Sequence, residues 1–369
     1  MTEKFYPVAE PNFMGNERKY LMDCVDSTWV SSKGKYIDLF EKEFAKKMGV
    51  KHAITTSNGT VSLHLILEAL GIGKGDEVIV PTFTYVASAN SVKYVGANPV
   101  FVDIDENTLN MDIEKIQEKI NDNTKAIMVV HMLGNPCDMA AIEILAQKNN
   151  LSIIEDAAEA LGSEFNTKKA GNLGTAGSFS FFGNKTITCG EGGMVTTNDD
   201  ELNKKIRSLK NHGQAGSKPY FHDTLGYNYR MTNMQAALGL AQLENLDKLV
   251  ERKIGINQEY RKHLKDLEDS GLIKFQKDQE NGLNSYWMTA VVINKELNFD
   301  DIEKRLRAEN IEVKPLFTPL HQLPFYDDES HPISEATSKN GLILPSGTTL
   351  SQEDIEIISS KFRKVLLED

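Results

Sequence analysis

Cysteine is scarce in this chain, and its placement excludes a disulfide framework. Cys24, Cys137 and Cys189 are odd in number and lie far apart in the sequence, whereas disulfide-stapled folds use paired cysteines at short spacings. The eight histidines show no metal-ligand spacing with one another or with a cysteine. We therefore expect neither structural disulfides nor a zinc or other metal site.

Basic residues are fewer than acidic ones, and long apolar runs are missing. The 41 lysines and arginines are outnumbered by 53 aspartates and glutamates, for a net charge of -12. This excess argues against a general surface for nucleic acid or anionic membranes, although a local basic pocket for a phosphorylated small molecule is compatible with it. No apolar run reaches the length of a membrane span, and the first residues have no apolar core of signal-peptide length. We expect a cytoplasmic protein without nucleic-acid or membrane partners.

Two common nucleotide-binding motifs are missing as well. No G-x-G-x-x-G follows any predicted strand. Five residues separate Gly177 from Gly183, and Asn184 stands between Gly183 and Lys185. A P-loop needs a shorter gap and a lysine directly after the second glycine. A dinucleotide-dependent dehydrogenase and a P-loop kinase are therefore poorly supported.

The chain shows instead a regular alternation of β-rich and helical segments within 369 residues of ordinary globular composition. The expected strands are 53–56, 77–80, 99–103, 126–130 and 151–154, and the expected helices are 61–70, 85–95, one that begins near 112, and 139–148. Strands that alternate with helices at this spacing predict an α/β fold with a mostly parallel sheet covered on both faces.

The last third of the chain has a different pattern. A single long helix is expected from 234 to about 264, followed by a strand at 291–293 and helices at 300–309 and 351–367. We expect the long helix to link two domains. The first is a large α/β domain with an N-terminal arm (residues 1–245), and the second is a small α+β domain (residues 246–369).

Ligands of parallel sheets bind beyond the carboxyl ends of the strands, where three groups of residues stand out. Residues 57–60 (Ser-Asn-Gly-Thr) follow a strand and open a helix, an arrangement that binds anions, although a plain helix cap is equally compatible. Tyr85 follows the strand that ends at Pro81 and is placed to stack on a planar ring or to pack in the core. Asp156 ends an apolar run; it is placed to pair with a cation such as a pyridinium nitrogen, to cap a helix at 157–161, or to do both.

The most informative stretch runs from Gly177 to Lys185. Its aromatic and hydroxyl residues predict a buried strand, and a glycine-dense turn follows at 190–193. A lysine held in a dry pocket can carry an aldehyde cofactor as a Schiff base. The alternative is a lysine that emerges into water at the end of a strand, and this stretch alone does not decide between the two.

Together and in this order, these segments resemble the DegT/DnrJ/StrS-type sugar aminotransferases, which are pyridoxal phosphate (PLP)-dependent enzymes with the aspartate-aminotransferase fold (fold type I). The resemblance covers nearly the whole chain, including Trp29 to Gly34, Glu155 to Gly162, the lysine stretch, and Gly226 to Arg230. Within this family, the segment from Trp29 to Gly34 and the residues around Lys185 are most similar to the enzymes that aminate carbon 4 of a GDP-linked 4-keto-6-deoxy sugar.

The resemblance implies a role for each candidate residue. Lys185 would bind PLP covalently and move the proton in catalysis, and Asp156 would pair with the pyridine nitrogen. Asn228 would reach the phosphate from the neighbouring subunit, which implies a homodimer with shared active sites. The other assignments are Tyr85 on the ring face, Gly59, Thr60 and Ser180 on the phosphate, Glu159 near the ring's oxygen substituent, and His321, Trp29 and His131 in the sugar pocket. A solvated or capped side chain is the alternative for His321.

The activity implied by this resemblance is transfer of an amino group from L-glutamate to the keto carbon of a nucleotide-linked sugar. Relatives with histidine in place of the lysine are sugar dehydratases, so the presence of Lys185 favours transamination. Three alternatives are left open, since a fold does not determine a substrate. They are the same chemistry on a small phosphorylated ketone such as dihydroxyacetone phosphate, a catalytically silent PLP-binding protein, and a nucleotide-sugar-binding protein without PLP.

Overall fold

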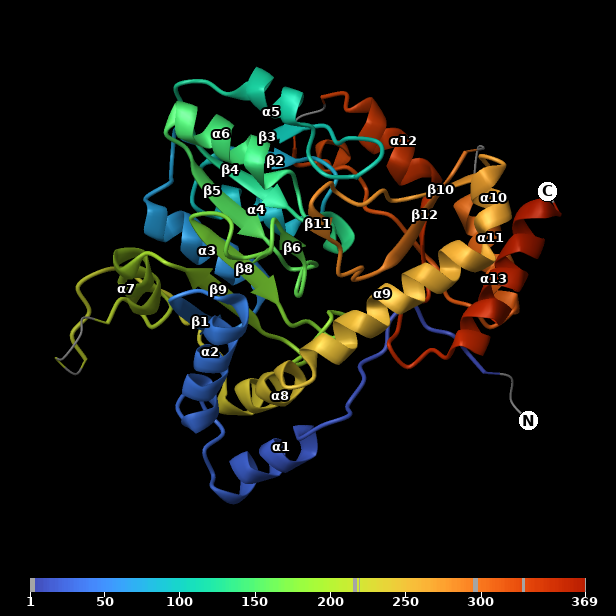
Figure 1. The fold of residues 1–369 in the computed structure, drawn as a ribbon. Helices are drawn as coiled ribbons and strands as arrows, with labels where there is room; N and C mark the ends of the chain where they lie inside the picture. The colour runs from blue at the N-terminus through green and yellow to red at the C-terminus, as the bar shows by residue number, and fades with distance from the viewer. Residues whose placement is uncertain (1–3, 215–217, 219, 295–297, 327–328, 369) are drawn as a thin grey trace.

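The computed structural model describes residues 4–214, 218, 220–294, 298–326 and 329–368. Its largest sheet has seven strands (Figure 1). In spatial order they are β1 (His52–Thr56), β9 (Gly193–Thr197), β8 (Ala176–Ser180), β5 (Ser152–Asp156), β4 (Thr124–Val130), β2 (Glu77–Pro81) and β3 (Asn98–Val102). β9 runs antiparallel to both of its neighbours, and the pairs from β8 to β3 are parallel. The mostly parallel sheet predicted from the sequence is confirmed.

Helices cover both faces of this sheet because its strands are apolar on both sides. In β2, Val78 and Val80 belong to the buried cluster on one face, and Ile79 belongs to the cluster on the other. Successive strand residues point to opposite faces, so an unbroken apolar run requires cover on both. One face is covered by α3 (Gly59–Leu70), α4 (Ala87–Tyr94) and α7 (Asp200–Leu209), and the other by α5 (Ile113–Lys119), α6 (Met139–Asn149) and α2 (Lys35–Met48).

A second, antiparallel sheet has a core of its own. Its strands, in spatial order, are β10 (Ile273–Phe275), β12 (Thr289–Ile293), β14 (Gly341–Leu344) and β13 (Lys314–Pro315). Two helices, α11 (Phe299–Ala308) and α13 (Gln352–Leu367), pack on it. The remaining elements are α1 (Glu17–Asp26), η1 (Met132–Gly134), α10 (Lys265–Asp269), η2 (Leu320–Gln322), α12 (Pro332–Asn340), and a small sheet of β6 (Glu164–Phe165), β7 (Lys168–Lys169) and β11 (Gly282–Leu283). The expected α+β character of this part is confirmed, and the boundary at residue 246 stays a prediction.

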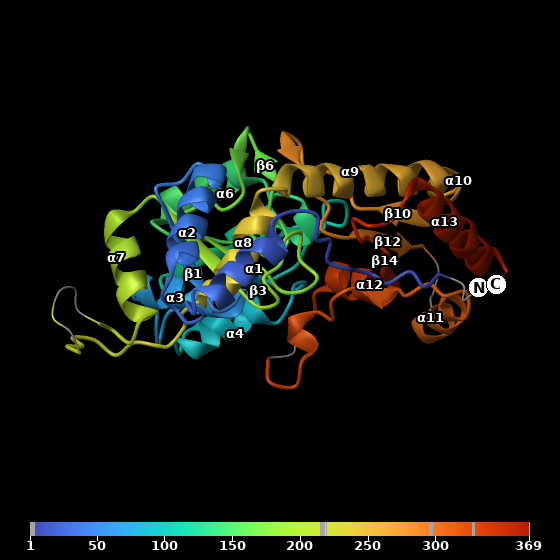
Figure 2. The same cartoon turned by 90° about the horizontal axis from the view of Figure 1, so that it is seen from below.

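Helix α9 (Leu246–His263) connects the two cores. Leu249 and Val250, near its start, belong to the buried cluster under the first sheet, and Ile256 and Tyr260 belong to the cluster of the second sheet. Figure 2 shows α9 extending from the side of the large sheet toward α10 and α13. The same helix therefore contributes to both cores.

The single helix predicted from 234 to 264 is wrong. The chain forms α8 (Asn233–Leu243) and then α9, and Asn245 between them has φ -109 and ψ 10, which are not helical. The amide of the Asn245 side chain donates to the carbonyl of Ala241 at 3.5 Å, and asparagine competes with helical hydrogen bonding in this way. The apolar spacing continues across the break, so periodicity does not reveal it.

None of the helices in the described part of the chain is both long and apolar enough to cross a membrane. The described residues also contain no group of three or more His, Cys, Asp or Glu side chains that could hold a metal ion.

Candidate active site

A cavity of about 620 Å³ opens at the carboxyl edge of the large sheet. Because parallel strands end at the same edge, they bring residues from distant parts of the chain together. Trp287, which precedes β12, faces the cavity from the side of the second sheet. The sequence-predicted residues that line the cavity are Gly59, Thr60, Tyr85, Asp156, Glu159, Ser180 and Lys185.

Lys185 follows β8, and its amino group lies among these residues. Its side chain is 13% exposed, which excludes the alternative of a lysine in open water. Nζ lies 3.7 Å from Oε1 of Glu159 and 3.7 Å from the centroid of the Trp287 ring. Burial lowers the pKa of Lys185 from its ordinary value, against the opposing effects of Glu159 and Asp156. A lowered pKa increases the fraction of neutral amine, which is the form that attacks a carbonyl.

The carboxyl group of Glu159 is fixed beside this amine. Its Oε2 accepts a hydrogen bond from the main-chain N–H of Leu133 at 2.9 Å, and Leu133 has a left-handed φ of 57. Burial raises the pKa of Glu159, and the nearby Lys185 opposes that rise. Burial thus shifts both members of the pair toward their neutral forms.

Asp156 is the last residue of β5 and is buried at the base of the cavity. Its Oδ2 accepts a hydrogen bond from Oγ of Ser88 at 2.8 Å, and its Oδ1 accepts one from the N–H of Ala158 at 3.2 Å. Burial raises the pKa of Asp156, while these hydrogen bonds oppose the rise. The helix expected at 157–161 is absent; these residues form turns that end near Gly162, whose φ is 97. The carboxylate therefore serves the cavity and not a helix.

The N-terminus of α3 forms another wall of the cavity. Oδ1 of Asn58 accepts a hydrogen bond from the N–H of Val61 at 3.0 Å. The helix cap that the sequence offered as an alternative to an anion site is therefore present. Gly59 packs so closely on β8 that an added Cβ would lie 2.9 Å from Cβ of Ser180. The cap and a phosphate site are compatible, because a helix start presents several N–H groups and the positive end of the dipole.

A model of the DegT/DnrJ/EryC1/StrS aminotransferase family matches residues 12–363. This chain belongs to that family. It is 47% identical to GDP-perosamine synthase from Escherichia coli O157:H7, over 95% of this chain and 96% of that protein. It is 48% identical to GDP-perosamine synthase from Vibrio cholerae, again over 95% and 96%. The PLP form of the putative sugar aminotransferase Spr1654 from Streptococcus pneumoniae matches with a TM-score of 0.93 and 28% identity, over 99% of each chain. The expectation of a PLP-dependent aminotransferase with fold type I is confirmed.

The cavity of this aminotransferase fits PLP. Asp156 is a buried carboxylate that lines the cavity, and a protonated ring nitrogen would be a direct ionic partner for it. The amine of Lys185 is available for the aldehyde, and the start of α3 is available for the phosphate. Tyr85 stands at the mouth, with 61% of its surface exposed, and its stacking on the ring stays a prediction.

Four other residues predicted to belong to the site are not among the described residues that line the cavity: Trp29, Asn228, His321 and His131. Trp29 is 55% exposed in the segment after α1, and Asn228 forms a β-bridge with Asn211; neither is among the described residues that line the cavity. His321 is buried in η2, where Nδ1 lies 2.8 Å from Oγ1 of Thr82 and Nε2 lies 3.1 Å from Glu335. It is therefore not the solvated side chain considered as an alternative. The sugar contacts assigned to Trp29 and His321 stay predictions.

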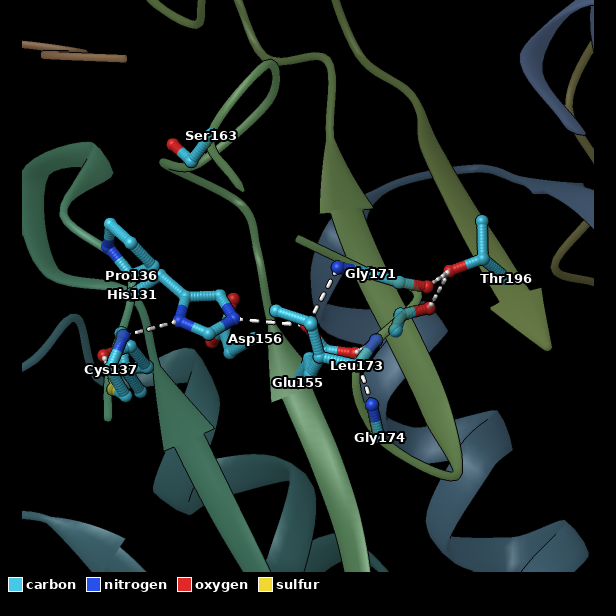
Figure 3. Close-up of polar contacts among 12 residues, drawn as sticks. His131, Pro136, Cys137, Glu155, Asp156, Ser163, Gly171, Leu173, Gly174 and Thr196 are labelled. Atoms are coloured by element: carbon cyan, nitrogen blue, oxygen red, sulfur yellow. Dashed lines mark hydrogen bonds and ion pairs between the residues drawn. The ribbon is translucent and has the colours of Figure 1, made fainter. Parts of the chain in front are cut away.

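His131 is not among the described residues that line the cavity; it is buried and takes part in a hydrogen-bond network with Cys137 and Glu155 (Figure 3). Its Nδ1 accepts a hydrogen bond from the N–H of Cys137 at 3.1 Å, which leaves the ring proton on Nε2, 3.0 Å from Oε2 of Glu155. Glu155 also accepts main-chain N–H bonds at 2.6–2.7 Å from three residues of the loop before β8. These three are Gly171, Leu173 and Gly174. Glu155 thus fixes this loop to β5, directly beside Asp156.

Replacing Glu155 by alanine should lower the free energy of unfolding by about 3–5 kcal/mol, because it leaves several buried donors without an acceptor. Urea denaturation of the purified proteins measures this change. Glu143→Ala, at an exposed position on α6, is the matched control, for which we expect a change within about 0.5 kcal/mol. A loss below about 1 kcal/mol for Glu155→Ala would contradict the role of this carboxylate in fixing the loop.

Sequence reasoning missed two residues that touch the site. Trp287 lies over the amine of Lys185, although about a hundred residues separate them, and no spacing in the chain connects the two. Ser88 binds Asp156 from the first turn of α4. Its position three residues after Tyr85 was the available signal, since residues one helical turn apart share a face.

Proposed function

We propose that this aminotransferase transfers an amino group from L-glutamate to carbon 4 of a GDP-linked 4-keto-6-deoxy sugar. The observation that carries the proposal is the near-full-length similarity, at 47% and 48% identity, to two proteins named GDP-perosamine synthase. The cavity supports it, because an amine, a carboxylate and a helix N-terminus border one space of about 620 Å³, within the usual range for cofactor and substrate sites.

Two residues would carry the chemistry. PLP supplies an aldehyde that takes up the amino group and a ring that draws electrons from the reacting carbon. Lys185 would hold the cofactor through Nζ and, when Nζ is released, would carry the proton to and from the reacting carbon. Asp156, whose pKa is raised by burial against the opposing effects of its hydrogen bonds and of Lys185, would keep the ring nitrogen protonated.

The remaining residues would position the cofactor. Gly59, Thr60 and Ser180, which meet at the start of α3 and the end of β8, would bind the phosphate. Tyr85 at the mouth would cover the ring face, and Glu159 would lie near the ring's oxygen substituent. All five line the same cavity as Lys185.

We further propose a homodimer with shared active sites. Asn228 lies outside the described wall of its own cavity, as expected of a residue that serves a neighbouring subunit. Apolar side chains on and after α1, including Met22, Val25 and Trp29, are about half exposed. Exposed apolar side chains so near one another in the sequence are typical of a protein interface.

A spectroscopic half-reaction tests the substrate. The PLP-loaded protein is converted with L-glutamate to its amino form and freed of the donor, and the acceptors are then added separately. We expect the original absorbance to return at least about tenfold faster with GDP-4-keto-6-deoxymannose than with a thymidine-linked analogue, since a pocket that hydrogen-bonds its substrate discriminates strongly.

The other outcomes separate the alternatives. Recovery with dihydroxyacetone phosphate alone would keep the chemistry and overturn the sugar. Failure of L-glutamate to change the spectrum would overturn the donor. A purified protein that takes up no PLP would instead favour a nucleotide-sugar-binding protein.

A further inference from the structure

The ring of Trp287 covers the amino group of Lys185. Nζ lies 3.7 Å from the ring centroid, and Trp287 is buried. The residue comes from the segment before β12, so the second sheet supplies this side of the cavity. A cation at this distance over an indole face is attracted by the electron density of the ring.

Hydrogen bonds at both ends hold Trp287 in place. Its Nε1 donates to the carbonyl of Asn184 at 2.8 Å, one residue before Lys185. Its own carbonyl accepts a hydrogen bond from Nζ of Lys253 on α9 at 2.8 Å, and Lys253 also donates to the carbonyl of Ser346 at 2.7 Å. Lys253 is buried, so displacing Trp287 would leave buried polar groups unpaired.

The free amine therefore has a defined position between two partners. Oε1 of Glu159 lies 3.7 Å from Nζ, and the indole ring lies at the same distance. Both favour the charged amine, as does Asp156, whereas burial disfavours it. Unlike the carboxylates of Glu159 and Asp156, the ring attracts the charge without being able to take the proton.

We propose that Trp287 holds the amino group of Lys185 whenever that group is not bonded to the cofactor. The inference rests on the proposed function, in which Lys185 leaves the cofactor and carries a proton during each half of the reaction. An untethered amine could form a close ion pair with Glu159 and stay there. The ring face keeps Nζ inside the cavity and within reach of the reacting carbon, with its proton available for transfer.

Chemical labelling of cofactor-free protein tests this position without any substrate. The pH dependence of Lys185 acetylation by acetic anhydride, read by peptide mass spectrometry, gives the pKa of its amine. Trp287→Phe and Trp287→Met remove similar volumes, but only the first keeps a ring. We expect the pKa of Lys185 to be roughly one pH unit lower in Trp287→Met than in Trp287→Phe, because the methionine variant loses the cation–π attraction. Equal values in the two variants would overturn the proposal.

Kinetics of the PLP-loaded variants give a second readout. The half-reaction with L-glutamate should slow about tenfold in Trp287→Met, mainly in its maximal rate, because misplacement of a proton carrier is costly. Ile144→Met, at an exposed position on α6, is the control and should keep the rate of the parent. If Trp287→Met does not fold, Trp287→Leu, which also lacks a ring, takes its place, and a pKa and rate equal to those of Trp287→Phe overturn the proposal. Labelling requires neither donor nor sugar, so a wrong substrate assignment and a wrong role for Trp287 give different results.

Discussion

Replacing Lys185 by alanine should reduce amino transfer by at least about a thousandfold, since it removes both the covalent anchor of the cofactor and the proton carrier. The protein should still bind PLP, because Asp156 and the start of α3 border the cavity independently of the lysine. The cavity itself should persist, since Lys185 lies in a loop after β8 and forms no part of the strand. Lys185→Ala thus separates binding from catalysis.

Absorbance after dialysis measures the bound cofactor in Lys185→Ala, and single-turnover reactions with L-glutamate measure transfer. Lys74→Ala, at an exposed position before β2, is the matched control and should behave as the parent. Turnover that survives in Lys185→Ala would refute the assignment. Loss of PLP together with turnover would show that the lysine is needed for binding as well.

Replacing Asp156 by asparagine should lower turnover by about a hundredfold to a thousandfold, because the variant no longer holds a charge against the protonated ring of the cofactor. An asparagine side chain has nearly the same shape, so its Oδ1 can still accept from the N–H of Ala158, and its NH₂ group can donate to Oγ of Ser88. Single-turnover rates in the PLP-loaded proteins measure the loss. Asp122→Asn, at an exposed position, is the control, and a rate close to that of the parent in Asp156→Asn would contradict the role.

Although Asp156→Asn should lower turnover, it should not lower the folding stability of the cofactor-free protein. Burial raises the pKa of Asp156 in the folded state. Its contribution to stability is therefore complete below the ordinary carboxyl pKa of about 4 and is lost as the pH rises through the raised value. Asparagine carries no charge to bury, so without PLP the variant should be at least as stable as the parent at pH 7. Urea denaturation at pH 4 and pH 7 checks this, and a marked loss of stability at pH 7 in Asp156→Asn would contradict it.

The sequence predicts the large sheet well because each of its strands can be recognised from the local sequence alone. The apolar runs ending at Pro81 and Asp156 are short, bounded and flanked by helical patterns, and the carboxyl-edge rule then selects Asp156, Tyr85 and the segment at 57–60. The second sheet is harder, since β10, β13 and β14 are two to four residues long and pair across wide gaps in the sequence.

Contacts between the two sheets cannot be predicted from local sequence patterns. The approach of Trp287 to Lys185 depends on where β12 is placed relative to β8, and the burial of His321 depends on its pairing with Thr82 and Glu335. Neither arrangement leaves a periodic trace in the sequence. The break at Asn245 was missed for a related reason, because a side chain that competes with the main chain does not disturb the apolar spacing.

Helix α9 also limits how this protein can open. It has 18 residues, a rod about 27 Å long, and its two ends are buried in different cores. Lys253, halfway along it, donates hydrogen bonds to the carbonyls of Trp287 and Ser346, which lie at one end of the second sheet. A rotation of one core against the other would have to bend this rod or pull a buried end free. We therefore expect substrate to enter and leave through the loops at the mouth of the cavity, while the two walls that carry Lys185 and Trp287 keep their relative positions.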